Sequence, residues 1–225
     1  MNAARRRYEW IKRLLDITVT AFLLVITSPL MLAVTAAVAL ALGRPLLFQQ
    51  GRTGHHGQLF TLVKFRTMRT EGEERGAAGD GERLTRLGKW LRATSLDELP
   101  TLWNVLRGDM SLVGPRPLLP SYIDRYTPKQ ARRHEVRPGI TGLAQVRGRN
   151  ALTWDEKFAY DVQYVDRRCL SLDLRILVET PLAVLRRKGI TAKDSPTAPE
   201  FVGDTRPPDT VLGASATDKA KEPAA

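Results

Sequence analysis

The stretch ITVTAFLLVITSPLMLAVTAAVALAL, residues 17–42, carries no charged side chain and decides the architecture of this chain. As a straight helix it would extend roughly 39 Å at about 1.5 Å per residue, which exceeds the roughly 30 Å hydrocarbon core of a bilayer. It is too long for the apolar core of a signal peptide, and no convincing small-residue cleavage site follows it. We therefore expect it to remain in the protein as a membrane anchor.

Ser28 and Pro29 lie near the middle of this segment. A proline in a helix interior removes a hydrogen bond and clashes with the preceding turn, at a cost of about 3 kcal/mol. A re-entrant hairpin would leave the basic flanks of both ends on one side of the membrane, as the positive-inside tendency prefers. A kinked span is the alternative, because a nearby serine can satisfy the backbone around the proline. The residues alone leave both geometries open.

The 225-residue chain has a formal net charge of +11 and is long enough for one domain with appendages. Such an excess of basic residues indicates a polyanionic partner, which can be nucleic acid, an anionic membrane face or a phosphorylated substrate. The single cysteine, Cys169, excludes an internal disulfide and suits a reducing compartment. The histidines lack partners at zinc-site spacing, so no structural zinc is expected.

The region after the anchor predicts an α+β, mainly helical fold. Residues 45–68 predict a small β-hairpin with a Gly- and His-rich turn, and residues 70–82 predict a mobile loop. From Arg83 the spacing of Leu84, Leu87 and Leu91, with Trp90 beside them, predicts a basic amphipathic helix. We expect this helix in the membrane interface; packing on the protein's own core is the alternative.

Two further helices are predicted at residues 153–165 and 170–188, and the polar, Pro-rich segment from residue 191 predicts a disordered tail. The domain boundaries that we expect are therefore 1–43 for the basic N-terminus and membrane helix, 44–190 for a membrane-associated catalytic domain, and 191–225 for the tail.

Asp97 and Glu98 form an acidic pair in this basic chain, within RATSLDELP, residues 92–100. One interpretation is helix capping, since Ser95 and Glu98 fit the S-x-x-E pattern. Pro100 complicates it and predicts a break near Leu99. The other interpretation is chemical: two carboxylates can hold Mg²⁺ beside a diphosphate, and one of them can attack phosphorus.

Two Gly- and Pro-rich stretches follow, SLVGPRPLLP at residues 111–120 and RPGITGLAQVRGRN at residues 137–150. Rigid turns of this kind can aim arginines at a phosphate, or they can be simple connectors.

Three motifs in this order, after a membrane segment with a central Ser-Pro, resemble the monotopic phosphoglycosyl transferases, also called bacterial sugar transferases. They are KFRTM at residues 64–68, TSLDELPTLWNVLRGDMSLVGPRP at residues 94–117 and PGITGLAQVRGRN at residues 138–150. The resemblance runs from about Lys12 to Ile190 and implies that the Ser28-Pro29 break makes the anchor a re-entrant helix hairpin.

The resemblance also implies a reaction. A sugar 1-phosphate would pass from a nucleoside diphosphate sugar, usually a UDP-sugar, to polyprenyl (undecaprenyl) phosphate, with release of UMP. Asp97 would be the nucleophile, Glu98 would assist with Mg²⁺ and with the acceptor, and both would contact the metal. The candidate phosphate-binding residues are Lys64, Arg66, Arg92, Arg116, Arg147 and Arg149.

The location implied by the resemblance is the cytoplasmic face of the bacterial inner membrane, at the first membrane step of surface polysaccharide synthesis. The partners would be the UDP-sugar, the lipid phosphate and the bilayer, with no nucleic acid and with self-association left open. The alternative function is a membrane-anchored binder of anionic lipid or nucleic acid without chemistry; the absence of aromatic-rich RNA motifs and of a helix-turn-helix pattern argues against nucleic acid.

Overall fold

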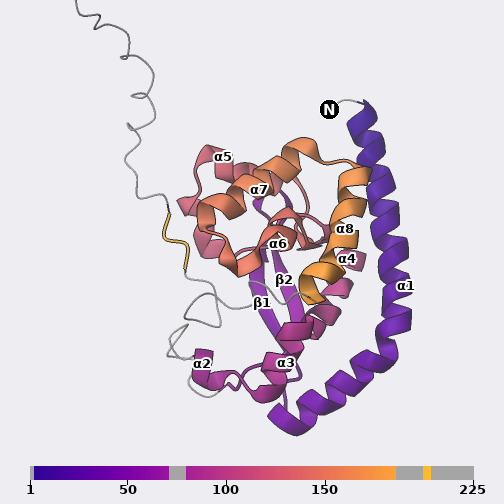
Figure 1. Ribbon diagram of the computed structural model, residues 1–225, viewed down its shortest axis with the longest axis vertical. Coiled ribbons are helices and arrows are strands. Elements are labelled where there is room, and N and C mark those ends of the chain that lie inside the picture. Colours follow the sequence, from indigo (N-terminus) through magenta and orange to yellow (C-terminus); the bar gives the residue numbers. More distant parts are fainter. Residues whose placement is uncertain (1–2, 71–79, 186–199, 204–225) are drawn as a thin grey trace, which may run out of the picture.

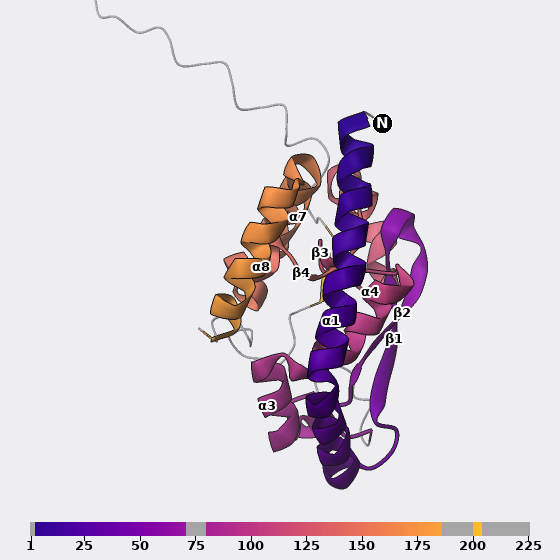
Figure 2. The same cartoon turned by 90° about the vertical axis from the view of Figure 1, so that its right-hand side faces the viewer.

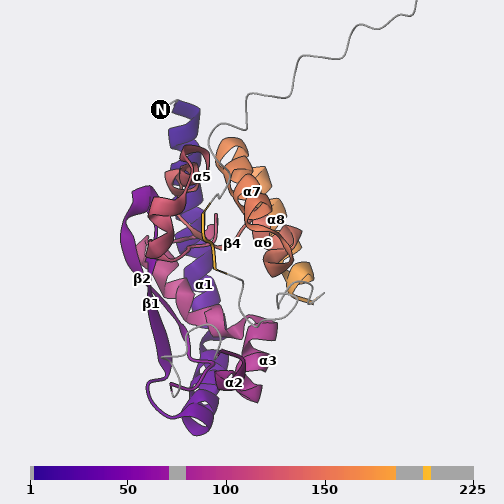
Figure 3. The ribbon, with the colours of Figure 1, turned by 90° about the vertical axis from the view of Figure 1, so that its left-hand side faces the viewer.

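The computed structural model describes residues 3–70, 80–185 and 200–203. A long helix, α1 (Ala3–Leu42), runs along the molecule, and the other described helices and strands lie along one side of it (Figure 1). In the view of Figure 3, the hairpin of β1 (Leu47–Thr53) and β2 (Leu59–Phe65) lies on one side, helices α7 (Trp154–Arg167) and α8 (Leu170–Leu185) lie on the other, and β4 (Gly139–Thr141) lies between them. The fold is mainly helical with small β elements, as predicted.

Helix α1 is the only helix among the described residues that is long and apolar enough to cross a membrane. Only 11% of its apolar window is buried inside the protein, so this helix is not the core helix of a soluble domain. Large side chains such as Phe22, Val25 and Leu32 are more than half exposed. An apolar surface of this extent needs a lipid environment.

The predicted division of α1 into a hairpin is not confirmed, because the helix continues through Ser28 and Pro29 and bends instead (Figure 1). Pro29 has no N–H to donate to the carbonyl of Val25, and the hydroxyl of Ser28 donates to that carbonyl at 2.8 Å. The serine thus replaces the hydrogen bond that the proline removes. The helix bends there without ending.

The two parts of α1 contact different parts of the domain. Near its N-terminus, Arg13 donates to the carbonyls of Val105 and Leu106 at 2.7 and 2.9 Å, at the end of helix α4 (Leu102–Arg107). Past the bend, Val34 and Val38 are buried against Phe65 and Leu91. The bend therefore brings the second half of α1 under the elements that precede the acidic pair.

The β-hairpin predicted at residues 45–68 is confirmed. Strands β1 (Leu47–Thr53) and β2 (Leu59–Phe65) pair antiparallel, with Leu47 opposite Phe65 and Thr53 opposite Leu59. A short 3₁₀ turn, η1 (His55–Gly57), joins them, and Gly57 takes a positive φ of 77° there. Such a backbone angle favours glycine.

The free edge of β2 is covered by side chains from the segment that carries the acidic pair. Asn104, fully buried, accepts from the N–H of Val63 at 3.2 Å and donates to the carbonyl of Thr61 at 2.8 Å. Thr101 donates to the carbonyl of Val63 at 2.9 Å. These contacts satisfy strand groups that would otherwise be unpaired, and they fix the 3₁₀ helix η3 (Leu96–Thr101) beside the end of β2.

Two short parallel strands, β3 (Ser111–Val113) and β4 (Gly139–Thr141), hold the two Gly- and Pro-rich stretches together. A Cβ on Gly139 would lie 2.1 Å from the backbone nitrogen of Gly114, so this close approach requires glycine. The parallel pair sets the direction in which the chain leaves β3 toward Arg116.

The remaining elements are short except for three helices. Helices α3 (Arg86–Thr94), α7 (Trp154–Arg167) and α8 (Leu170–Leu185) confirm the predicted helices, within the described residues. The short elements are α2 (Asp80–Arg83), η4 (Pro120–Arg125), α5 (Pro128–Ala131), η5 (Arg132–Glu135), α6 (Leu143–Arg147) and η6 (Arg149–Ala151). The predicted loop at residues 70–82 lies mostly outside the described residues.

The amphipathic helix α3 differs from the prediction in one respect. Leu91 is fully buried and Leu87 packs with it against α1 and Phe65, so the leucine face contacts the protein's own core. Trp90 on α3 and Trp103 on α4 remain 51% and 56% exposed. The interfacial location of α3 stays a prediction that rests on its tryptophan.

Helix α8 lies beside α1 in both Figure 1 and Figure 2 and carries a second exposed apolar row. Leu174, Val178, Leu182 and Leu185 follow helical spacing and are between 50% and 76% exposed. At the start of α8, buried Asp173 accepts from the hydroxyl of Tyr8 at 2.8 Å and from Lys12 at 3.0 Å. These bonds connect the N-terminal part of α1 to α8.

The predicted tail from residue 191 contains a short described segment, residues 200–203. Residues 191–199 and 204–225 lie outside the described residues, but Phe201 is buried to 4% exposure in an aromatic cluster with Tyr122 and Phe158. An aromatic side chain can bury 150–250 Å² of surface. Phe201 therefore has a packing site although its polar, Pro-rich surroundings predict disorder.

Candidate active site

Asp97 and Glu98 lie in the first turn of η3, directly after α3. Ser95, between the two helices, has a left-handed backbone with φ 58° and makes no side-chain cap hydrogen bond. The capping interpretation of the acidic pair is therefore wrong. Regular α-helix resumes only after Pro100, at Leu102, which confirms the predicted break. Strained positions of this kind often adjoin functional sites.

Four of the basic residues predicted to bind phosphate come from separate elements and influence the acidic pair. Arg116, which follows β3, donates from Nη2 to Glu98 Oε1 at 2.7 Å. Lys64 lies near the end of β2, and Arg92 lies in the last turn of α3. The charges of these two residues and of Arg116 act to lower the pKa of Asp97. Arg149 begins η6 with a backbone φ of 53°, and its charge acts to lower the pKa of Glu98.

The carboxylates differ in their protonation behaviour because their surroundings differ. Burial, followed by the neighbouring charge of Glu98, raises the pKa of Asp97 to about 6 against the opposing effect of Lys64, Arg92 and Arg116. Burial also acts to raise the pKa of Glu98, but Arg116 and Lys64 outweigh it and the pKa of Glu98 is lowered. Glu98 is thus the permanently charged partner, whereas Asp97 carries the less stabilised carboxylate.

Burial disfavours the charged form of Lys64, as it does that of Asp97. Burial lowers the pKa of its ammonium group to about 8, although Asp97 acts in the opposite direction. The ammonium lies 5.2 Å from the centroid of the Phe48 ring, opposite Lys64 in the hairpin. A partly desolvated cation beside Asp97 can stabilise the charge of an anionic group that reaches this carboxylate.

Two predicted phosphate-binding residues do not join this cluster. The guanidinium of Arg66 donates to the carbonyls of Leu42 and Gly43 at the C-terminus of α1, and the residue is only 5% exposed. Its charge complements the helix end, which gives the residue a structural role, and its contact with phosphate stays a prediction. Arg147 lies at the end of α6 with an exposed side chain and is not among the main influences on either carboxylate.

Two basic residues that sequence reasoning missed lie near Arg116. Arg52, in β1, donates to the carbonyl of Pro117 at 3.3 Å, and burial together with Arg116 lowers the pKa of its guanidinium to about 10. Lys157, in α7, has its pKa lowered by burial and then by Arg116. The GRTG turn that contains Arg52 was a usable signal; Lys157, on an ordinary helix, carried none.

The backbone at Arg116 is held by a buried ion pair. Arg133 donates from Nη2 to the carbonyl of Arg116 at 2.6 Å, and from Nε and Nη2 to Asp161 at 3.0 and 2.8 Å. Both side chains of the pair are less than a tenth exposed. Arg133 therefore positions Arg116 through its main chain, while the side chain of Arg116 remains available to Glu98.

A divalent cation has an incomplete protein site here. Within the described parts of the chain, no group of three or more His, Cys, Asp or Glu side chains is placed to hold a metal. Mg²⁺ commonly takes one or two carboxylates and completes its shell with substrate phosphates and water. Asp97 and Glu98 fit that pattern, since they are adjacent carboxylates and Glu98 raises the pKa of Asp97.

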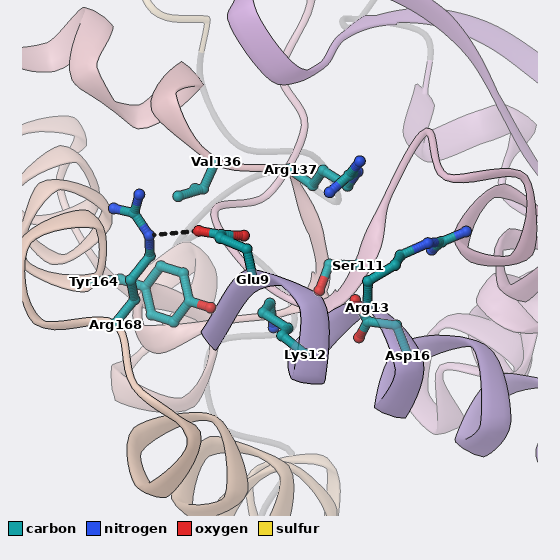
Figure 4. A pocket seen from close by; sticks show the side chains of 9 residues that line it. All are labelled: Glu9, Lys12, Arg13, Asp16, Ser111, Val136, Arg137, Tyr164 and Arg168. Atoms are coloured by element: carbon teal, nitrogen blue, oxygen red, sulfur yellow. Dashed lines mark hydrogen bonds and ion pairs between the residues drawn. The ribbon is translucent and has the colours of Figure 1, made fainter. Parts of the chain in front are cut away.

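A small cavity elsewhere, between α1, β3 and the C-terminal end of α7, is lined mostly by charged residues (Figure 4). Its charges are used within the protein: Glu9 pairs with Arg168 at 3.1 Å, and Asp16 accepts from the N–H of Leu112 at 3.1 Å. This cavity belongs to the junction between the anchor and the domain, not to the candidate active site.

A family model described as bacterial sugar transferase matches residues 7–187 of the chain. The chain is 53% identical to the uncharacterized sugar transferase EpsL of Bacillus subtilis, covering 86% of this chain and 96% of that protein. It is 43% identical to the UDP-glucose:undecaprenyl-phosphate glucose-1-phosphate transferase of Caulobacter vibrioides, covering 77% of this chain and 69% of that protein.

The undecaprenyl-phosphate galactose phosphotransferase of Salmonella typhimurium is 39% identical over 84% of this chain, which spans 43% of that protein's length. These relatives are transferases, which argues against the alternative of a binder without chemistry. The matched region contains the anchor, the acidic pair and the convergent cations, so the chain belongs to the bacterial sugar transferase family and is an enzyme, a phosphoglycosyl transferase.

Proposed function

We propose that the chain transfers a sugar 1-phosphate from a nucleoside diphosphate sugar, a UDP-sugar, to undecaprenyl phosphate through a covalent aspartyl intermediate. The products are undecaprenyl diphosphate sugar and UMP. Relatives that match between 77% and 84% of this chain are named for undecaprenyl-phosphate acceptors. The observation that carries the proposal is the buried carboxylate of Asp97, poised between the charge of Glu98 and the cations Lys64, Arg92 and Arg116.

In the first half-reaction, a carboxylate oxygen of Asp97 attacks the phosphorus that bears the sugar. The bond from this phosphorus to the oxygen of the nucleotide's phosphate breaks, and UMP leaves with that oxygen and the electron pair. Arg116, Arg92 and Lys64 face the negative charge of the transferring group. Because Glu98 is already paired with Arg116, its carboxylate is less free to compete as nucleophile, and its charge raises the pKa of Asp97.

In the second half-reaction, an oxygen of the lipid phosphate attacks the same phosphorus, and the bond to Asp97 breaks. The carboxylate is regenerated with no net proton change on Asp97. Asp97 and Glu98 would hold Mg²⁺ together with diphosphate oxygens, where the cation would neutralise phosphate charge. The covalent route lets a soluble donor and a membrane-bound acceptor use one site in turn.

The expected covalent adduct tests this proposal directly. Purified protein mixed with Mg²⁺ and a panel of UDP-sugars, without lipid phosphate, should release UMP in one stoichiometric burst. Quenching and mass spectrometry should find the added sugar phosphate on the peptide that contains Asp97. The panel identifies the sugar. Turnover that requires both substrates at once, with no adduct at any time, would refute the intermediate.

We further propose that α1 enters and leaves the membrane on the cytoplasmic side of the bacterial inner membrane. The basic residues at both ends of the apolar segment support this path, as does a bend that keeps the backbone satisfied at Ser28 and Pro29. On this view the enzyme performs the first membrane step of surface polysaccharide synthesis.

Cysteine labelling tests the membrane path. In a Cys169→Ser background, single cysteines at Arg6 and Gln49 should both react with an impermeant maleimide only after the inner membrane is opened. The unsubstituted protein, in which exposed Cys169 is the single cysteine, is labelled separately as the reference for the side of the catalytic domain. Labelling of the Arg6 position from the periplasm, with Gln49 still protected, would establish a span instead.

A further inference from the structure

The segment Glu200–Gly203, which we call the tail segment, is docked on the catalytic domain. The ring of Phe201 lies 4.9 Å from the ring centroid of Phe158, 5.6 Å from Tyr122, 5.5 Å from Trp154 and 5.8 Å from Tyr126. The family match ends at residue 187, so the tail segment lies outside the shared region. The family pattern therefore does not account for this contact.

Polar contacts fix the tail segment as well as its ring. The backbone N–H of Phe201 donates to the hydroxyl of Tyr122 at 3.3 Å. Arg125 donates to Glu200 at 2.8 Å and to the carbonyl of Phe201 at 2.5 Å. Gly203 then takes φ +97° over the side chain of Arg125, a conformation that favours glycine. The pocket thus recognises an acidic residue, an aromatic ring and a turn in fixed order.

The aromatic pocket adjoins the residues that hold Arg116. The guanidinium of Arg133 lies 5.9 Å from the ring centroid of Tyr126 and 5.7 Å from that of Phe158, which both contact Phe201. The same guanidinium donates to the carbonyl of Arg116. Packing at the pocket therefore reaches the active site through one intermediate side chain.

We propose that the tail segment is an internal ligand of this enzyme, which fills the aromatic pocket on η4 and α7 and thereby keeps Arg116 in place beside Glu98. The occupant is the chain's own peptide, in which Glu200, Phe201 and the turn at Gly203 make the contacts. Its activity consequence rests on the proposed function, whereas its docking does not.

The test compares Phe201→Ala with Val202→Ala in the full chain. Val202 is the matched control because it is adjacent in the tail segment and 71% exposed. Hydrogen–deuterium exchange should show faster exchange in residues 118–126 and 154–158 for Phe201→Ala only. Roughly tenfold lower kcat/KM for the UDP-sugar is expected for that variant, with Val202→Ala unchanged.

A free peptide covering residues 197–206 should restore exchange protection and activity to Phe201→Ala, whereas the same peptide carrying the Phe201→Ala change should not. Because the tail segment acts through Arg116, Phe201→Ala should change activity by less than about twofold in an Arg116→Lys background.

Equal exchange in the two tail variants would overturn the docking, and this measurement needs no catalytic activity. Altered exchange with an undiminished, fully additive loss of activity in the Arg116→Lys background would overturn the link to Arg116. If the enzyme shows no UMP release at all, the exchange and peptide experiments still decide the docking, so the two proposals fail separately.

Discussion

Replacing Asp97 with asparagine should lower UMP release by at least about a thousandfold, because an amide cannot act as the nucleophile. The same change should make the folded protein more stable at pH 8. Burial raises the pKa of Asp97 from its ordinary value of 3.8 to about 6, so the ionised carboxylate costs the folded state up to about 3 kcal/mol. Asparagine removes that cost.

The pH dependence gives the sign of this effect. A carboxyl group with a raised pKa in the folded protein binds its proton more tightly there than in the unfolded chain. Its unfavourable contribution is complete above about pH 6 and absent below about pH 4. Asp97→Asn should therefore raise the thermal midpoint at pH 8 and have little effect at pH 4.

Asp124→Asn is the control, because this substitution removes the same charge from an exposed position. It should retain activity and show no such stabilisation. Thermal unfolding in detergent and a UMP assay measure both properties on the same samples. Normal turnover of Asp97→Asn would exclude Asp97 as nucleophile, and a lower midpoint at pH 8 would mean that its carboxylate stabilises the fold.

Replacing Arg133 with methionine should destabilise the protein by about 3–5 kcal/mol, because Asp161 would be left as an uncompensated buried charge. The pair is nearly solvent-free, with side chains 3% and 6% exposed. Activity should fall as well, because the carbonyl of Arg116 loses its donor. Thermal and denaturant unfolding, with the UMP assay at a temperature where the variant is folded, separate the two effects.

Arg132→Met provides a matched control one residue away. Arg132 pairs with Glu135 and Asp166, but this pair is about half exposed, so its loss should change stability little. The double variant Arg133→Met with Asp161→Leu should recover most of the stability and little of the activity. Equal destabilisation by Arg132→Met and Arg133→Met would contradict the importance of burial.

The acidic pair in a strongly basic protein has a physical explanation in this arrangement. Asp97 and Glu98 are held close together, and their mutual repulsion is offset by cations from β2, α3, the turn after β3, and η6. Those cations outnumber the two carboxylates. The resulting positive excess suits a diphosphate donor and, after UMP has left, the phosphate of a lipid acceptor.

The amino-acid sequence by itself determined the apolar anchor helix, the β-hairpin, the helices after residue 153 and the acidic pair. The physical reason is that these features depend on near neighbours: an uncharged run, alternation or helical spacing, and a proline that prevents regular helix until Leu102. The bend at Pro29 is similarly local, because the carbonyl that loses its donor lies within reach of Ser28.

Only the tertiary structure decided which partner each basic side chain has. Arg66 and Arg116 are both predicted from their motifs to bind phosphate, yet one binds the end of α1 and the other binds Glu98. A guanidinium binds whatever carbonyl or carboxylate the fold brings within about 3 Å, and that depends on packing between segments far apart in the chain. The burial of Phe201 among aromatic rings from η4 and α7 has the same origin.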